Sequence, residues 1–446
     1  MKIIIAGAGD MGFHLAELLS IENQDIVLID LDQNVLEYAS TQLDLLTMRG
    51  DATSMSLLKQ AGAPTANLVL AVTASEEVNL MVAILAKKMG ARKVIARVNK
   101  EDYLSEAGRD TISSLGIDQL ISPRQLAANE IELLVKQCSF TDAFDFEEGK
   151  LSLVGITLDS HSALVGLTVK NIALFKKEPD LMPIAILRGH KTIIPRGDTL
   201  FRANDHVYFI TRPDRKEQIE TFVGRRQLSV KRVMIMGGTA LARDTACRLQ
   251  ENYAVTIIER QAERCKQLAE KLDKSLVIHG DYTNFTLLEG EGLSEMDVFI
   301  ALTENSETNI IACLTAKNYG VYKTIAQVEN KDYIHVSQDI GVDTLINKRL
   351  MAANNIFRFV RKGRIEAITS LHGVDAEVIE YVITKNNKMT RKPLKDLHFP
   401  DTAIVGGVIR GEESLIPNGD FQLALNDRVI VFALPQAISR LETLFR

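Results

Sequence analysis

Residues 1–30 read MKIIIAGAGDMGFHLAELLSIENQDIVLID, and this stretch decides the fold of the chain. An apolar run over Lys2–Ala6 meets the glycine turn Gly7–Gly12, which is followed by an amphipathic helical pattern. A second apolar run, Ile26–Ile29, ends on the acidic residue Asp30. This order of strand, glycine turn, helix, strand and carboxylate predicts the βαβ unit that binds an adenine dinucleotide.

Each glycine of the turn has a physical reason. Gly7 permits the tight turn out of the strand, and Gly9 removes a Cβ that would keep a diphosphate from the backbone. Gly12 lets the helix pack closely on the sheet. The free N–H groups near Asp10 and Met11 then face the phosphates, and the helix dipole adds to their attraction.

The acid at the end of the second strand predicts which nucleotide fits. Asp30 follows Gly12 by 18 residues, where a carboxylate can accept hydrogen bonds from a ribose diol. The same charge disfavours a 2′-phosphate, so we expect NAD(H) rather than NADP(H). Glycines also serve ordinary turns, and it is the complete register of strand, helix and acid that favours nucleotide binding.

Composition sets the broad class of the protein. The 446 residues are 46% hydrophobic and 25% charged, with a net charge of −6 that gives no attraction to nucleic acid. Four scattered cysteines and eight dispersed histidines predict no metal site. No apolar run approaches the ~18–20 residues that span a bilayer, and the chain begins with a strand. We therefore expect a cytoplasmic protein without a signal peptide.

Strands and helices continue to alternate after Asp30, which predicts a doubly wound parallel sheet of Rossmann-like α/β class. The chain then changes character over residues 140–222, where alternating segments surround polar turns and predict a small α+β module. The further predicted strands are Leu43–Met48, Asn67–Val72, Lys93–Val98 and Gln119–Ile121, and the predicted helices are Ser54–Ala61, Glu76–Met89 and a closing helix over Pro123–Gln137.

The whole unit of fold and module is duplicated. Gly7 matches Gly237, Gly50 matches Gly280 and Asn79 matches Asn309, all at an offset of 230 residues. The duplication predicts four domains. They are a nucleotide-binding lobe at 1–139, a C-terminal lobe at 140–225, a second nucleotide-binding lobe at 229–369 and a second C-terminal lobe at 370–446.

Shorter motifs repeat in the same order. The segment Arg124–Asn129 matches Arg349–Asn354, and the turn Pro195–Asp198 of the first module matches Pro417–Asp420 of the second. The polar segment 224–227 separates the two halves.

With this organisation the sequence resembles the TrkA family of Trk potassium uptake systems, whose units are called RCK or KTN domains. The resemblance covers essentially all of the chain. It is carried by IIIAGAGDMG, VLID, GDAT at 50–53, AVTASEEVNLMVA at 71–83 and IARVNKEDY at 95–103. It implies a cytosolic regulatory subunit, peripheral on the inner face of the plasma membrane, that gates a membrane-embedded potassium transporter.

The resemblance also implies site residues. Asp30 would hold the adenosine ribose, and Arg97 would face the phosphate end, where its charge suits ATP or ADP as well as NAD(H). The alternative for Arg97 is a surface ion pair. Asp51 would lie by the adenine, or else only close a turn at a strand end. The residues implied to hold the phosphates are Gly7, Ala8, Gly9, Asp10, Met11 and Gly12, and those implied to lie near the adenine or the fourth strand are Asp51, Ala52, Thr73 and Ala74.

The second copy departs from this pattern. Thr239 stands where Gly9 lets a phosphate approach, and Gln327 replaces Arg97 and loses its positive charge. We therefore expect the first copy to bind tightly and the second weakly or not at all. The second-copy residues that keep the pattern are Gly237, Gly238, Glu259 and Asp281.

Two classes of function follow. The leading one is the gating subunit, which the family implies is a homotetrameric ring whose small modules pair across subunits. The rival is an NAD-dependent oxidoreductase or a free-standing NAD(H) redox sensor. A dehydrogenase needs a proton donor near the nicotinamide and a substrate domain. The small module has no such constellation and follows both folds, so we expect no enzyme and no catalytic residues.

Overall fold

The computed structural model describes most of the chain. The described residues are 1–20, 24–138, 140–146, 149–174, 181–189, 191–215, 219, 223, 229–330, 333, 340–361, 368–370, 376–386 and 388–445. The predicted break at 224–227 lies outside them.

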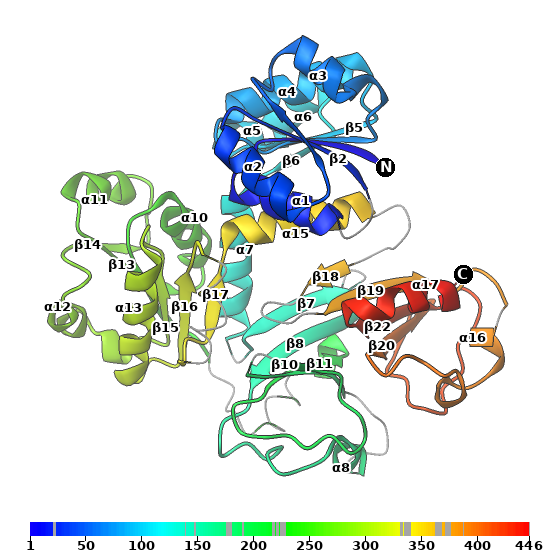
Figure 1. Ribbon diagram of the computed structural model, residues 1–446. Coiled ribbons are helices and arrows are strands. Elements are labelled where there is room, and N and C mark those ends of the chain that lie inside the picture. The colour runs from blue at the N-terminus through cyan, green and yellow to red at the C-terminus, as the bar shows by residue number, and fades with distance from the viewer. Residues whose placement is uncertain are drawn as a thin grey trace. The chain divides into compact units, whose positions relative to one another are not determined.

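The first fold is a parallel six-stranded sheet in the order β3-β2-β1-β4-β5-β6 (Figure 1). Its strands are β1 (Lys2–Ala6), β2 (Asp25–Asp30), β3 (Leu46–Arg49), β4 (Leu68–Ala71), β5 (Lys93–Arg97) and β6 (Gln119–Ile121). Its helices are α1 (Asp10–Ser20), α2 (Gln33–Gln42), α3 (Met55–Ala61), α4 (Glu76–Met89), α5 (Glu101–Leu104), α6 (Glu106–Ser114) and the start of α7 (Pro123–Lys136). The strand order reverses between β1 and β4, where sheets of this class bind ligands. The predicted fold class is confirmed.

Helix α4 shows how the sequence sets its own boundaries. The Ser75 side chain accepts a hydrogen bond from the Val78 N–H at 3.2 Å, which caps the amino end. The acidic pair Glu76–Glu77 in the first turn and the basic pair Lys87–Lys88 in the last turn complement the helix dipole. Gly90 ends the helix at φ +116°.

The third strand differs from its prediction over Leu43–Met48. It begins only at Leu46, because helix α2 extends to Gln42 and the Leu43 N–H donates to the Ala39 carbonyl at 2.9 Å. The apolar pattern of this segment therefore belongs partly to the end of a helix.

The second fold repeats the first with strand order β14-β13-β12-β15-β16-β17. Its strands are β12 (Arg232–Met236), β13 (Ala254–Glu259), β14 (Leu276–His279), β15 (Val298–Ala301), β16 (Lys323–Gln327) and β17 (Thr344–Ile346). Its described helices are α10 (Ala240–Leu249), α11 (Ala262–Ala269), α12 (Phe285–Gly290) and α13 (Ser306–Asn318), and its last strand is followed by α15 (Lys348–Arg361). The predicted duplication of the parallel sheet is confirmed.

Each small module has a five-stranded antiparallel sheet, β10-β9-β11-β8-β7 and β18-β19-β22-β20-β21. The elements of the first are β7 (Asp142–Phe146), β8 (Leu151–Thr157), α8 (Val169–Leu174), β9 (Leu181–Arg188), β10 (Lys191–Ile193) and β11 (His206–Thr211). Those of the second are β18 (Ile368–Ser370), β19 (Glu377–Val382), α16 (Lys388–Arg391), β20 (Ala403–Arg410), β21 (Glu413–Leu415), β22 (Arg428–Ala433) and α17 (Ile438–Phe445). An ion pair between a partly exposed arginine and a buried aspartate recurs in both modules. Arg188 Nε donates to Asp205 at 2.7 Å, and Arg410 Nε donates to Asp427 at 2.8 Å.

The two modules of one chain pack against each other, and their expected pairing across subunits stays a prediction. Ile184 and Ile210 of the first share a buried apolar cluster with Ile430 of the second. Gly406 makes this approach possible, because a Cβ there would lie 2.4 Å from Ile210 Cδ1. The duplicated apolar faces therefore cover each other within the chain.

Helix α15 joins the first fold, although it follows the last strand of the second. The chain divides into one unit of residues 1–129 with 347–360 and another of residues 130–346 with 361–446. In the first unit, α15 lies beside α1 (Figure 1). Ala353 and Ile356 of α15 are buried in the same apolar cluster as residues of α1. In the second unit, Glu132 of α7 pairs with Arg248 of α10 at 3.6 Å.

The helix predicted over Pro123–Gln137 to close its own sheet is divided between the two units, with Leu126 packed against the core of the first fold. Only residues 123–129 of that helix belong to the unit of the first fold. The two helices carry matching Arg124–Asn129 and Arg349–Asn354 segments, and an apolar stripe does not say which of two similar sheets it covers.

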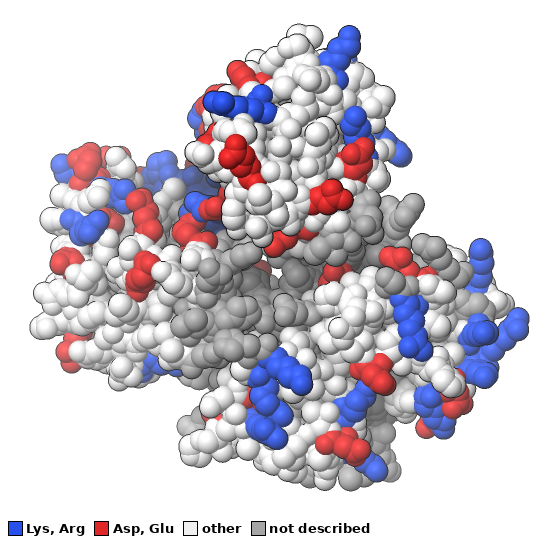
Figure 2. All heavy atoms as spheres, in the orientation of Figure 1, with Lys and Arg blue, Asp and Glu red and all other residues white. Residues whose placement is uncertain are grey.

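Described basic and acidic side chains are interspersed on the face drawn in Figure 2. None of the described helices is both long and apolar enough to span a bilayer.

Candidate functional site

The turn between β1 and α1 has the backbone that its glycines predict. Gly7 has φ +106°, and a Cβ there would lie 2.8 Å from the Thr73 backbone nitrogen. A Cβ on Gly12 would lie 1.8 Å from the Gly7 carbonyl oxygen. Gly12 is therefore required because a side chain would clash with the backbone of the turn. The sequence had suggested a different reason, the close packing of the helix on the sheet.

Gly9 opens the turn to a ligand. A Cβ built on Gly9 would meet no atom within 4 Å, so the missing side chain leaves open space in front of the backbone. The Phe13 N–H donates to the Gly9 carbonyl at 2.8 Å, which makes Gly9 the residue that starts helix α1. Helix geometry leaves the N–H groups of Asp10 and Met11 without acceptors inside the helix. This is the arrangement that binds a phosphate at a helix amino end.

The acid of the second strand is fixed against the same turn. Asp30 ends β2, and its carboxylate accepts hydrogen bonds from the Ala8 N–H at 2.6 Å and from the Asp32 N–H at 3.0 Å. The Ala8 amide therefore positions Asp30, and a contact of Ala8 with a phosphate stays a prediction. The half-buried carboxylate lies beside the glycine turn, where a ribose that follows the phosphates would reach it.

The end of the third strand lies next to Asp30. The Gly50 N–H donates to the Asp30 carbonyl at 2.9 Å. Asp51 Oδ1 accepts hydrogen bonds from the Thr53 backbone N–H at 2.9 Å and from its hydroxyl at 2.8 Å, and these bonds lower the pKa of Asp51. These bonds fit the turn at the strand end, and contact of Asp51 with adenine stays a prediction. Ala52 is buried in the core cluster of the fold.

Asn79 joins the ends of the fourth and fifth strands through its hydrogen bonds, a role that the sequence analysis did not predict. It is 1% exposed, and its amide donates to the Thr73 carbonyl at 3.1 Å and to the Arg97 carbonyl at 3.0 Å. Its Oδ1 accepts from the Thr73 N–H and hydroxyl at 2.8 and 2.7 Å. One side chain thus fixes Thr73 and the Arg97 backbone at the carboxyl edge of the sheet, and Ala74, which follows Thr73, is exposed. Its recurrence as Asn309 was the available signal.

The predicted residues of the first fold therefore meet at one edge of one sheet. The glycine turn, Asp30, Asp51 and Thr73 follow strands β1 to β4, and Arg97 ends β5, which pairs with β4. The predicted residues of the second fold lie at the corresponding edge of a separate sheet. Each fold therefore has its own candidate site.

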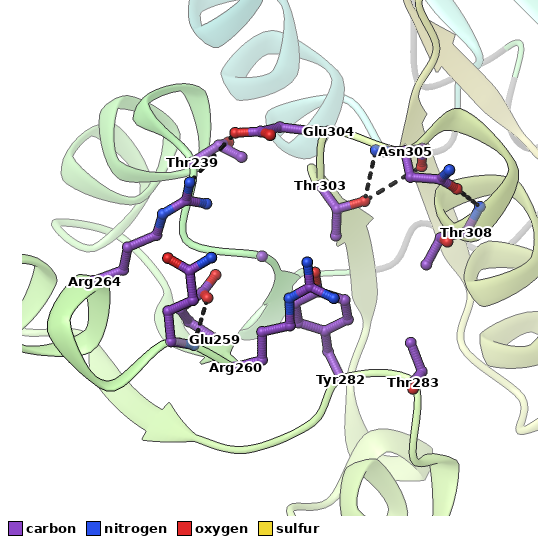
Figure 3. A pocket seen from close by; sticks show the side chains of 12 residues that line it. Thr239, Glu259, Arg260, Arg264, Tyr282, Thr283, Thr303, Glu304, Asn305 and Thr308 are labelled. Atoms are coloured by element: carbon purple, nitrogen blue, oxygen red, sulfur yellow. Dashed lines mark hydrogen bonds and ion pairs between the residues drawn. The ribbon is translucent and has the colours of Figure 1, made fainter.

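The second fold has a pocket of about 130 Å³ at this edge (Figure 3). It is lined by Gly237, Thr239, Glu259, Arg260, Gln261, Arg264, Tyr282, Thr283, Thr303, Glu304, Asn305 and Thr308. Of the four residues predicted for this site, Gly237 and Glu259 line the pocket. Gly238 and Asp281 have backbone and turn roles. The Gly238 N–H donates to Glu259 at 2.6 Å, and Asp281 accepts from the Thr283 N–H at 2.9 Å.

Thr239 closes the phosphate position of the second fold. Its hydroxyl accepts a hydrogen bond from the Ala242 N–H at 3.2 Å and donates to the Leu302 carbonyl at 2.9 Å. A side chain thus satisfies an amide of the first turn of α10 that a phosphate would otherwise use. The structure gives a physical basis for the expectation that this copy binds less well.

The acid of the second fold is more deeply held than Asp30. Glu259 is 2% exposed, and its second oxygen accepts from the Gln261 N–H at 2.7 Å. Gln327, which stands in the place of Arg97, is also buried and donates to Glu329 at 2.9 Å.

Two arginines that the sequence analysis did not predict as site residues line the second pocket. Arg260 lies over the Tyr282 ring at 5.6 Å, and Arg264 pairs with Glu304 at 3.4 Å (Figure 3). The position of Arg260 directly after Glu259 was the only signal for it. Arg260 and Arg264 thus bring positive charge to this pocket, whereas Gln327 is not among the residues that line it.

Among the described residues no group of three or more histidine, cysteine, aspartate or glutamate side chains is placed to hold a metal ion.

The family described as the TrkA-N domain matches residues 3–123 and 233–348, and the TrkA-C domain matches residues 153–224 and 378–446. The chain is 34% identical over 450 residues to the Trk system potassium uptake protein TrkA homolog of Archaeoglobus fulgidus. It is 33% identical over 456 residues to TrkA homolog 1 of Methanosarcina mazei. Both alignments cover 100% of each chain.

Among solved structures, the chain is similar to the GsuK channel bound to NAD. The TM-score is 0.61 at 15% sequence identity, and the match covers 100% of this chain and 78% of that one. This likeness concerns the fold.

Proposed function

The chain belongs to the family of Trk system potassium uptake proteins TrkA, and from this premise we propose that it is a nucleotide-binding regulatory subunit that gates a membrane potassium transporter. The observation that carries the proposal is the open glycine turn of the first fold. Gly9 leaves free space in front of unpaired helix amides, and Asp30 is fixed beside it.

The same site suits more than one adenine nucleotide. Asp30 lies where a ribose diol would donate to it, which favours NAD(H). Arg97 ends the fifth strand at the same edge and brings a positive charge for the terminal phosphates of ATP or ADP. A channel of similar fold, GsuK, was solved with NAD bound. We propose NAD(H) as the principal ligand, with ATP and ADP competing for the same turn.

Regulation requires that the ligands distinguish two shapes of the assembly. A nucleotide shifts a conformational equilibrium only by its difference in binding free energy between the two states. A difference of ~2.7 kcal/mol corresponds to a hundredfold shift. We propose that tandem chains assemble as a tetrameric ring on the cytoplasmic side of the membrane subunit, and that NADH and ATP differ in their contacts with the turn and with Arg97.

The test has two parts. Calorimetric titration of the full chain with NADH and with ATP is expected to show one high-affinity site per chain. Potassium flux through a co-reconstituted Trk membrane subunit is then expected to change with nucleotide, while pyrophosphate, which lacks the adenosine, has no effect. Two equivalent tight sites would contradict the assignment to the first fold. Flux that ignores nucleotide, together with hydride transfer at useful turnover, would favour a dehydrogenase.

A further inference from the structure

An arginine from the far half of the chain reaches the phosphate turn of the first fold. The guanidinium of Arg349 forms an ion pair with the carboxylate of Asp10, 339 residues away in sequence. Asp10 is the first residue of helix α1 and follows Gly9 directly. The pair therefore lies at the amino end of the helix whose free amides are the candidate phosphate donors.

Arg349 is held in this place by its own helix. Asn347 is 3% exposed, and its side chain accepts hydrogen bonds from the Arg349 and Leu350 N–H groups, both at 3.1 Å. This cap fixes the first turn of α15. Four residues further along, Ala353 and then Ile356 are fully buried in the apolar cluster of the first fold. Packing therefore fixes the point from which the Arg349 side chain extends.

The charges at this point matter for an anionic ligand. The Asp10 carboxylate alone would repel a phosphate that approaches the turn, and Arg349 offsets that charge. The Asp10 side chain is 73% exposed and that of Arg349 is 37% exposed, so both can change partner without leaving a buried charge. A guanidinium binds a phosphate in the same forked geometry as a carboxylate.

We propose that Arg349 is a phosphate-binding residue of the first nucleotide site, and that it exchanges Asp10 for the phosphates when a nucleotide binds. The inference rests on the proposed function and adds a residue from the second half of the chain to the site. The binding free energy that Arg349 contributes rises with the negative charge of the phosphate chain. Arg349 therefore favours ATP over ADP and ADP over NAD⁺. Strand β17 of the second sheet ends at Ile346, three residues before Arg349.

The experiment measures nucleotide affinity by calorimetry on the full chain. Arg349→Gln is expected to weaken ATP about tenfold and NAD⁺ about threefold, as for the loss of one charge-assisted contact. Arg349→Lys keeps the charge and should recover part of the loss. Asp10→Asn removes the competing carboxylate and should tighten ATP about threefold. Arg92→Gln removes one positive charge from an exposed position of the same fold and is expected to leave both affinities unchanged.

Other results would overturn the proposal. If wild-type protein binds ATP and the Arg349→Gln variant binds it equally well, the role of Arg349 is refuted and the proposed function still stands. If Arg349 only pins α15 through Asp10, then Asp10→Asn and Arg349→Gln weaken all nucleotides equally, which also refutes it. Wild-type protein that binds no adenine nucleotide would refute the proposed function as well. Circular dichroism of each variant shows that the fold is retained.

Discussion

The two Rossmann-like folds of this chain share their scaffold and differ at the amino end of one helix. In both, the carboxylate at the end of the second strand accepts a hydrogen bond at 2.6 Å from a backbone N–H of the glycine turn. The Ala8 N–H donates to Asp30, and the Gly238 N–H donates to Glu259. Gly9 of the first fold leaves an open space, whereas the corresponding Thr239 fills its position with a hydroxyl that caps the helix. Duplication has kept the bonds that shape the turn and changed those available to a phosphate.

The two folds also differ in the positions of their positively charged side chains. The first fold has Arg97 at the end of its fifth strand, and Arg349 pairs with Asp10 at its turn. The second fold has buried Gln327 in the first of these places, and Arg260 and Arg264 line its pocket instead. Two copies of one fold therefore present different charge to a ligand, although their sheets have the same strand order.

The largest expected effect distinguishes the two turns directly. Gly9→Val puts an isopropyl group into the open space at the turn, and no neighbouring atom of the fold opposes it. We expect the affinity for NADH to fall at least a hundredfold, a loss of ~2.7 kcal/mol, because the phosphates can no longer approach the amides. Thr239→Val at the matched position should leave this affinity unchanged. Unaltered binding by Gly9→Val, measured by calorimetry, would refute the site.

The next prediction concerns what the copies share. Asn79→Ala and Asn309→Ala each remove a buried amide that joins the fourth and fifth strands of its fold. Each change leaves backbone groups unpaired and should cost about 2 kcal/mol of local stability. Hydrogen exchange should report equal losses of protection at β4–β5 and at β15–β16, and the exposed-site control Gln33→Ala should report none. A loss in only one copy would show that the scaffolds are not equivalent.

Much of this comparison was predictable from the sequence. The run from Lys2 to Asp30 dictates strand, turn, helix and acid through local pattern alone, and its repetition at Gly237 predicts the second sheet. The role of Asp51 remained open between a turn and a ligand contact. Its bonds to Thr53 now favour the turn, and contact with adenine stays a prediction.

The rest depends on contacts between segments far apart in the chain. Helices α7 and α15 carry nearly the same apolar stripe, so the pattern could not assign α15 to the first sheet. The pairing of Arg349 with Asp10 follows only from that assignment. The burial of Glu259 and the closeness of Arg260 to Tyr282 are likewise set by tertiary packing. The sequence pattern thus predicts most helices and strands, whereas tertiary packing determines which charged side chains lie close together.

A third change should make the second turn resemble the first. Thr239→Gly removes the hydroxyl that caps α10 and frees the Ala242 amide. In a Gly9→Val background, where only the second fold can respond, ATP affinity should rise about fivefold, which corresponds to one added hydrogen bond of ~1 kcal/mol. The cost of the lost cap is a few tenths of a kcal/mol. If calorimetry shows no gain, the weakness of this site lies elsewhere, for example in the charge lost at Gln327.

The smallest effect is a pH dependence that both copies should share. Hydrogen bonds from Thr53 and from Thr283 lower the pKa values of Asp51 and Asp281 below their usual value of 3.8. A lowered folded-state pKa means that the charged form stabilises the fold above pH ~4 and that this contribution is lost as pH falls through the lowered pKa. Asp51→Asn and Asp281→Asn should each cost less than ~1 kcal/mol at pH 7, because both carboxylates are exposed. Urea unfolding midpoints should converge with wild type near pH 3 or below, and a gap that widened with acid would contradict the sign.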